Sequence, residues 1–160
     1  MVIILMGVSG CGKTTVGKLL AHKVGMPFFD GDDFHPSVNV QKMKSGQPLS
    51  DKDRQPWLEI LSSEISAWNR SGGAILACSA LKKKYRKILS AGDGEIRFVH
   101  LKGSRHVIME RLKKRTGHYM PPKLLDSQFE SLEIPRNALT VDIQQKPPKI
   151  VKKIIVELEI

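Results

Sequence analysis

Short apolar runs alternate with longer amphipathic segments along the whole chain. Residues 2–6, with the sequence VIILM, form an uninterrupted apolar run that ends at Gly7. Such a run is typical of a strand buried on both faces of a parallel sheet. Residues 14–24 follow with apolar side chains at helical spacing, and Gly25 stands where a helix would stop. This stretch therefore predicts a buried strand, a glycine-rich turn and an amphipathic helix.

The same alternation continues to the end of the chain. It predicts further strands at residues 27–29, 74–79, 96–101 and 138–143. It predicts further helices at residues 37–44, 50–68, 81–89, 104–115, 124–132 and 147–159, with a loop at 116–122 that holds one glycine and two prolines. Strands that alternate with helices require right-handed crossovers, which cover both faces of a parallel sheet. We therefore expect an α/β fold, a three-layer, doubly wound, five-stranded parallel sheet, in a single domain of residues 1–160.

The glycine-rich turn after the first strand matches the phosphate-loop pattern in full. Residues 7–14 read GVSGCGKT, between a predicted strand and a predicted helix. The glycines let successive N–H groups turn towards an anion, and the helix aims its positive end at the same point. We expect Lys13 to reach the β- and γ-phosphates of ATP and the Thr14 hydroxyl to ligate Mg²⁺. The predicted nucleotide-binding residues are Gly7, Val8, Ser9, Gly10, Cys11, Gly12, Lys13, Thr14 and Thr15.

Composition and charge narrow the class of protein. No apolar run approaches the roughly 20 residues that span a bilayer, so we expect a cytoplasmic protein with no membrane partner. The formal net charge of +10 favours anionic partners. The basic runs are not interleaved with the aromatic residues that a single-strand binder needs, so phosphorylated small molecules are expected rather than nucleic acid. A nucleotide-dependent RNA- or DNA-binding module is the alternative from another class. The chain lacks the Asn-Lys-x-Asp segment of GTPases, and a motor or pump ATPase would usually be longer. A small chain with acidic residues after the second strand and a basic helix before a loop fits a small-molecule kinase.

Acidic residues follow the second predicted strand. Asp30 and Asp32 lie at its carboxyl end, where doubly wound sheets bind their ligands. Two carboxylates there can serve Mg²⁺ and a substrate hydroxyl that loses its proton during phosphoryl transfer. On spacing alone, an acidic surface turn with Asp33 as a helix cap is the more frequent explanation.

Segments along nearly the whole chain resemble gluconokinases of the thermoresistant, phosphate-loop type. The specific segments are residues 48–57 and 78–86, because many unrelated activities share the phosphate loop. The resemblance also includes Asp30-Gly31-Asp32, His35-Pro36, Asn39, Lys42-Met43, Arg111-Leu112, Gly117-His118, Leu124-Leu125, Ser127-Gln128-Phe129-Glu130 and Leu132-Glu133. It implies a fold similar to shikimate and adenylate kinases. It also implies transfer of the γ-phosphate of ATP to the 6-hydroxyl of D-gluconate, giving 6-phospho-D-gluconate and ADP, and it suggests a homodimer.

The chemistry of gluconate agrees with several residues of this pattern. Gluconate is a carboxylate with a chain of hydroxyls, so its capture calls for a guanidinium fork and polar side chains. We expect Arg54 to bind the carboxylate, Asp32 to orient and deprotonate the acceptor hydroxyl, and Asp30 to help hold Mg²⁺ through water. Further substrate-binding candidates are His35, Asn39, Lys82 and Arg86. In the alternative reading, Arg54 is a salt-bridge partner of Asp51 or Asp53, and His35 is a turn residue.

Two functional segments flank the predicted site. Residues 35–70 are expected to form a substrate-binding helical segment, and residues 111–124 a lid. Arg111 and Arg115 are four residues apart, so on one helix they would share a face and close over the phosphates during transfer. A solvated basic helix face is the alternative.

Two other kinases are the alternatives within enzymes. Shikimate kinase would show a Gly-Gly-Gly turn after the third strand, where this chain has residues 78–80, CSA. Adenylylsulfate kinase carries Asp-Gly-Asp but lacks the segment at 48–57. Cys11 and Cys78 are expected to be ordinary small residues; the alternative is a reactive Cys11 thiol whose modification blocks ATP.

Overall fold

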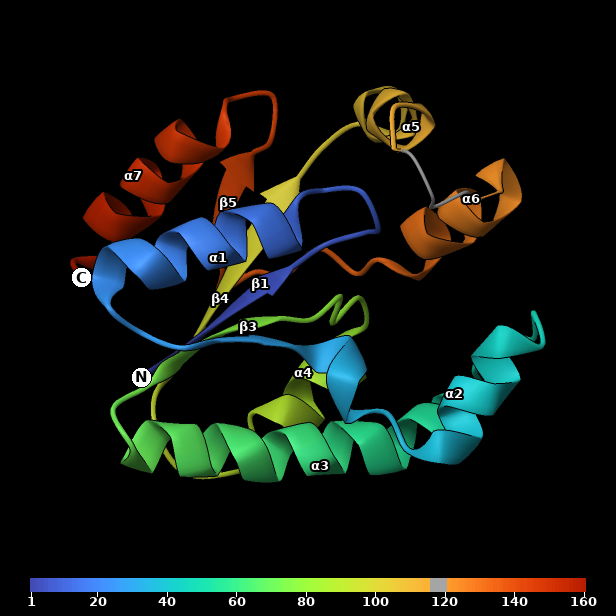
Figure 1. Cartoon of the computed structure of the whole chain (residues 1–160), viewed down its shortest axis with the longest axis horizontal. Helices are drawn as coiled ribbons and strands as arrows, with labels where there is room; N and C mark the ends of the chain where they lie inside the picture. The colour runs from blue at the N-terminus through green and yellow to red at the C-terminus, as the bar shows by residue number, and fades with distance from the viewer. Residues whose placement is uncertain (116–120) are drawn as a thin grey trace.

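Five parallel strands form one sheet in the order β2-β3-β1-β4-β5 (Figure 1). The computed structural model describes residues 1–115 and 121–160. The strands are β1 (Val2–Met6), β2 (Phe28–Asp30), β3 (Ala74–Ala77), β4 (Ile96–Lys102) and β5 (Leu139–Asp142). The helices are α1 (Lys13–Val24), the 3₁₀ helix η1 (Gly31–Phe34), α2 (Ser37–Lys44), α3 (Asp51–Arg70), α4 (Lys83–Leu89), α5 (Arg105–Lys113), α6 (Pro122–Ser131) and α7 (Pro147–Leu158). The predicted doubly wound α/β fold is confirmed.

Helices cover both faces of the sheet, as Figure 1 shows. Helices α1 and α7 lie on one face, and α3 and α4 lie on the other. All five side chains of β1 are fully buried, with Ile3 and Leu5 in the core under α1 and α7. Val2, Ile4 and Met6 belong to the core under α3. Because successive side chains of a strand point to opposite faces, a strand covered on both sides is apolar throughout.

Helix α3 has the N-terminal cap and the apolar spacing from which it was predicted. Ser50 accepts a hydrogen bond from the Asp53 N–H, and the Asp53 carboxylate accepts one from the Ser50 N–H, which completes a capping box. Its buried side chains are Trp57, Leu58, Leu61, Ile65 and Trp68. They form one apolar stripe against the sheet, while the exposed side of the helix is mostly polar, with Ile60 as an exception.

Several predicted boundaries differ from the structure by one or two residues, and two of them lie beside the site. Strand β3 ends at Ala77 rather than at residue 79, because the chain turns there and Ala80 adopts the left-handed region with φ of 45°. Helix α5 ends at Lys113, so Arg115 lies in the turn that follows it. Residues 116–120 of the predicted lid lie outside the described residues. Among the described residues, no helix is long and apolar enough to cross a membrane.

Candidate active site

In the phosphate loop, some backbone N–H groups form hydrogen bonds within the protein and others remain without an acceptor among the described residues. The Gly7 N–H donates to the Ser79 carbonyl (3.2 Å), and the Cys11 N–H donates to the Val8 carbonyl (3.3 Å). These bonds fix the course of the loop. Within residues 1–115 and 121–160, no acceptor pairs with the N–H groups of Gly10, Gly12, Lys13, Thr14 and Thr15. They lie at the N-terminal end of α1, where such groups bind anions.

Glycine is required at three positions of this loop. Gly7 has φ of 146°, and a Cβ there would lie 2.9 Å from the Leu101 carbonyl oxygen. Gly10 and Gly12 have φ of 84° and 96°, in the left-handed region that side chains rarely adopt. A Cβ on Gly10 would also lie 3.0 Å from the Leu112 side chain. The side chains of Val8 and Cys11 instead face the core, with 2% and 0% of their surface exposed. The burial of these two side chains therefore anchors the loop to the hydrophobic core.

A pocket lies between the phosphate loop and the carboxyl ends of β2 and β3. Its wall is formed by Ser9, Gly10, Gly12, Lys13, Thr14, Asp30, Asp32, Ala77, Cys78, Ser79 and Arg115. Lys13 lies across the loop and donates from Nζ to the carbonyls of Gly7 (3.0 Å) and Val8 (3.1 Å). The structure thus brings the predicted phosphate-binding residues and the two predicted acidic residues into one pocket. Of the predicted nucleotide-binding residues, Gly7, Val8, Cys11 and Thr15 lie outside this wall.

The turn that carries the two carboxylates is fixed by three contacts. Asp30 Oδ1 accepts a hydrogen bond from the Asp32 N–H (3.0 Å), which caps η1. Trp57 Nε1 donates to the Gly31 carbonyl (2.7 Å) from α3. A Cβ on Gly31 would lie 3.0 Å from the carbonyl of Ala77, so only glycine lets the turn pack this closely on β3. The position of Asp32 therefore depends on residues that hold it from two directions.

Asp32 keeps its proton more readily than an ordinary aspartate. Its side chain is 86% exposed, yet it lies on a concave wall where protein replaces part of the surrounding water. This loss of hydration raises the pKa of Asp32, and the negative charge of Asp30 raises it further. Lys13 acts in the opposite direction. A base with a raised pKa is better matched to accepting a proton near neutral pH.

His35 is a buried neighbour of Asp32 with a defined tautomer. Its side chain is 5% exposed and stacks on Trp57 with ring centroids 4.2 Å apart. Asn39 Nδ2 donates to the Asp53 carbonyl (2.9 Å) and contacts His35 Nδ1 at 3.3 Å. An amide nitrogen can only donate, so Nδ1 accepts and the proton of a neutral ring sits on Nε2, 4.0 Å from Asp32. Burial, and then Arg54, lower the pKa of His35, which favours that neutral ring.

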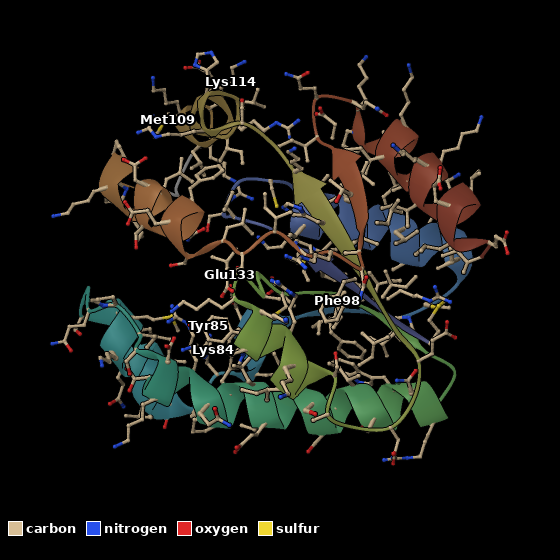
Figure 2. All side chains as sticks on the ribbon, turned by 180° about the vertical axis from the view of Figure 1, so that it is seen from behind. Lys84, Tyr85, Phe98, Met109, Lys114 and Glu133 are labelled. Carbon is tan, nitrogen blue, oxygen red and sulfur yellow. The ribbon has the colours of Figure 1, made fainter. Side chains whose placement is uncertain are left out.

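Arg54 lies in a cluster of charged side chains between α3 and α4. It donates to the Leu49 carbonyl (2.6 Å), and its guanidinium carbon lies 5.7 Å from the centroid of the Tyr85 ring. Lys82 Nζ lies at the same distance from that ring. Asp51 accepts hydrogen bonds from Lys82 (3.3 Å), Lys84 and the Tyr85 hydroxyl. Figure 2 shows Lys84 and Tyr85 on the side of α4 that faces the N-terminal end of α3.

The alternative of a structural salt bridge for Arg54 is wrong within the described part of the chain. Asp53 pairs instead with Lys42 (2.6 Å). The hydrogen bond from Lys42, and then those from Ser50, lower the pKa of Asp53 to about 2. Asp51 pairs with Lys82 and Lys84. Among the described residues, Arg54 thus has no carboxylate partner, and it lies near His35.

Arg86 lies away from the pocket. Its guanidinium donates to the carbonyls of Ala80 (2.8 Å), Leu81 (3.0 Å) and Glu133 (2.9 Å). These bonds join the loop after β3 to the segment after α6. Arg86 therefore has three structural contacts, and its role at the substrate stays a prediction.

Of the two predicted lid arginines, Arg111 lies on helix α5 and Arg115 lies in the turn that follows it. Arg111 donates to the Ile143 carbonyl, and a Cβ on Gly12 would lie 3.9 Å from its Nη1 atom. Arg115 lines the pocket from the turn after α5. The expectation that they share a helix face is wrong, because α5 ends before Arg115.

Both cysteines are buried. Cys11 is 0% exposed, and its sulfur lies 2.7 Å from where a Cβ on Gly7 would stand. Burial raises the pKa of the Cys78 thiol to about 12. Burial favours ordinary small residues at both positions. The Cys11 sulfur lies 3.8 Å from Lys13 Nζ, and the effect of its modification on ATP binding stays a prediction.

Comparison with known proteins assigns this site to a family. The family profile described as shikimate kinase matches residues 9–159. The thermosensitive gluconokinase of Escherichia coli (strain K12) is 48% identical over 83% of this chain and 72% of its own length. The thermoresistant gluconokinase of the same strain is 44% identical over 90% of this chain and 85% of its own. The chain belongs to the gluconokinase family.

A solved structure agrees with this membership. The crystal structure of a gluconokinase from Sinorhizobium meliloti 1021 matches with a TM-score of 0.88 at 42% identity, covering 98% of this chain and 90% of that one. The family that the sequence segments resembled is confirmed, and the protein is a phosphate-loop kinase. The shikimate and adenylylsulfate kinase alternatives are less similar in sequence, at 21% and 17% identity for two solved examples.

Three residues beside the candidate site were not given a functional role from the sequence. Trp57 was expected only as an apolar helix residue, but it holds the Gly31 carbonyl. Asp51 and Tyr85 join α3 to α4 beside Arg54. The signal for them was their place in the segments at 48–57 and 78–86, which carried the family resemblance without showing what each residue contacts.

We predict that Asp32→Asn lowers kcat at least about a hundredfold, because the amide cannot accept the hydroxyl proton. Its melting temperature at pH 7 should not fall. The raised pKa means that the folded state disfavours the charged carboxylate, so this cost appears as pH rises through that pKa, and the neutral amide removes it. In the wild type, kcat/KM should fall on the acid side with an apparent pKa above the ordinary value of about 3.9.

The matched control is Asp33→Asn, an exposed carboxylate in the same turn. It should keep kcat within about threefold of the wild type, since Asp33 does not line the pocket. Steady-state kinetics and thermal melts of both variants test the assignment. A near-normal kcat for Asp32→Asn, or equal losses in the two variants, would contradict it.

Proposed function

We propose that this protein transfers the γ-phosphate of ATP to the 6-hydroxyl of D-gluconate, giving 6-phospho-D-gluconate and ADP. One observation carries the proposal: Lys13 and Thr14 of the phosphate loop share a pocket with Asp30 and Asp32. A phosphate donor and a hydroxyl acceptor can meet only where both sets of groups face the same space. The identity of 44–48% with gluconokinases supports D-gluconate as the acceptor.

The nucleotide side of the pocket suits a triphosphate with Mg²⁺. Free N–H groups at the start of α1 and the Lys13 ammonium would bind phosphate oxygens. The Thr14 hydroxyl and Asp30 offer oxygen ligands, and no group of three or more His, Cys, Asp or Glu side chains gathers among the described residues. This donor set fits Mg²⁺, which keeps several waters and binds phosphates together with one or two protein oxygens. The ion would neutralise charge on the β- and γ-phosphates.

The acceptor side suits an alcohol that must lose a proton. Asp32 would orient the hydroxyl for in-line attack and take its proton as the new P–O bond forms. His35, held by Asn39 and Trp57, presents its Nε2 proton towards Asp32 and would fix the carboxylate or a second hydroxyl. Asn39 therefore acts through His35 rather than on the substrate itself.

Arg54 and Lys82 would bind the carboxylate of the sugar acid. Both lie 5.7 Å from the Tyr85 ring, so two positive charges lie near one aromatic side chain. Arg54 has no carboxylate partner among the described residues, whereas Lys82 already contacts Asp51. Arg54 is therefore the principal carboxylate ligand of the proposal, and Lys82 is secondary.

Further parts of the proposal concern segments and context. Residues 35–70 would form the substrate-binding segment, and residues 111–124 the lid that brings Arg111 and Arg115 over the phosphates. A cytoplasmic location, a homodimer and the absence of a nucleic-acid partner remain predictions from the sequence.

We predict turnover with D-gluconate in a coupled ADP-release assay over a panel of sugar acids that includes shikimate and adenylylsulfate. The product should carry phosphate at carbon 6, which ³¹P and ¹³C NMR of the reaction mixture can identify. Activity with shikimate or adenylylsulfate and none with D-gluconate would refute the proposed acceptor.

We predict that Arg54→Ala raises KM for D-gluconate at least about tenfold and changes KM for ATP by less than about twofold. A charge-assisted hydrogen bond to the carboxylate is lost, and it contributes to ground and transition states alike. Arg70→Ala, at the exposed end of the same helix, is the matched control and should change neither constant. Equal increases of both KM values in Arg54→Ala would point to a structural arginine.

A further inference from the structure

The Gln128 side chain joins helix α6 to the phosphate loop by two hydrogen bonds. Gln128 Oε1 accepts a hydrogen bond from the Ser9 N–H (2.7 Å), and Gln128 Nε2 donates to the Ser9 hydroxyl oxygen (3.0 Å). The two residues are 119 positions apart in the chain. A backbone N–H can pair only with the amide oxygen, so this bond fixes which way the Gln128 amide points.

Gln128 supplies one of the bonds that set the course of the loop. The Gly7 and Cys11 N–H groups donate to the carbonyls of Ser79 and Val8. Those two bonds run from backbone to backbone and survive any change of side chain. Ser9 lies between these anchors, and its N–H is held by a side chain. A substitution of Gln128 therefore removes a bond to the loop that no other described segment replaces with a backbone group.

The helix that carries Gln128 is itself firmly placed. Leu125 is fully buried in the core, and Asp126 pairs with Arg105 of α5. At the other end of α6, the Glu133 N–H donates to the Leu81 carbonyl (2.8 Å) in the loop after β3. A helix with these contacts that holds Ser9 from the side of the pocket can keep the neighbouring Gly10 and Gly12 N–H groups aimed at a phosphate.

We propose that Gln128 is a positioning residue for the nucleotide, which holds Ser9 so that the free N–H groups of the phosphate loop stay directed at the phosphates. This role rests on nucleotide binding at the loop and not on which hydroxyl compound accepts the phosphate. Binding of Mg-ADP, which needs no acceptor, therefore tests it separately from the proposed gluconate activity.

The experiment is isothermal titration of Mg-ADP into the full chain and its variants. Gln128→Met, of similar length but with no hydrogen-bonding amide, should weaken Mg-ADP binding about tenfold, the loss that one or two neutral hydrogen bonds produce. KM for ATP should rise by a similar factor. KM for the acceptor and kcat should change less than about threefold, since the loop binds ground and transition states alike.

A double-variant cycle separates this role from a general loosening of α6. Ser9→Ala removes one of the two bonds and should weaken Mg-ADP binding about threefold. Added to Gln128→Met, it should change binding less than about twofold further, because that bond is already absent. Glu130→Gln, exposed on the same helix, should leave the affinity unchanged. Asp126→Asn, which breaks the α5–α6 ion pair, should weaken binding less than about twofold.

Three results would overturn the proposal. The first is an Mg-ADP affinity of Gln128→Met within twofold of the wild type. The second is a double variant in which the losses of affinity of Ser9→Ala and Gln128→Met multiply. The third is a loss of affinity in Asp126→Asn as large as that in Gln128→Met. Thermal melts show whether each variant is folded. If Gln128→Met does not fold, Gln128→Ala takes its place with the same expectations, since alanine favours helix and reaches neither atom of Ser9.

Discussion

The direction of a few backbone N–H groups between β1 and α1 is the constraint on which the site depends. A phosphate binds there only if those groups lack partners within the protein, and the loop keeps its shape only if others have them. The structure separates the two sets, with Gly7 and Cys11 paired and Gly12 to Thr14 unpaired within the described residues. The buried strand β1 and the glycines at positive φ make this separation possible. Burial of the Val8 and Cys11 side chains anchors the same loop from below.

The acceptor side is built by a chain of contacts that begins at helix α3. Its Trp57 fixes the turn between the two carboxylates, and the same ring stacks on His35. The backbone of α3 also orients the Asn39 amide, which sets the proton of His35. One helix thus positions Asp32 and the groups around it, while the parallel sheet brings that turn to the edge where the phosphate loop lies.

Sequence patterns predicted what depends on neighbours in the chain. The strand at Val2–Met6, the phosphate loop and the apolar stripe of α3 follow from local spacing, and the structure has all three. Contacts between distant segments could not be predicted in this way, because they depend on how the elements pack. Arg86 was expected at the substrate, and no pattern in the sequence indicated that it binds three carbonyls, one of them 47 residues away. Gln128 was part of a family segment, but its partner Ser9 becomes visible only when α6 is folded against the loop.

The most direct test of the account is an amide ¹H–¹⁵N spectrum of the protein titrated with Mg-ADP. We predict that the largest changes fall on the N–H groups of Gly10, Gly12, Lys13 and Thr14, which would gain phosphate oxygens as acceptors. The signals of Gly7 and Cys11, whose N–H groups are already paired, should move less. Largest changes on α3 and α4, or a larger change at Gly7 and Cys11 than at Gly12 and Lys13, would contradict the assignment of the free N–H groups as the phosphate site.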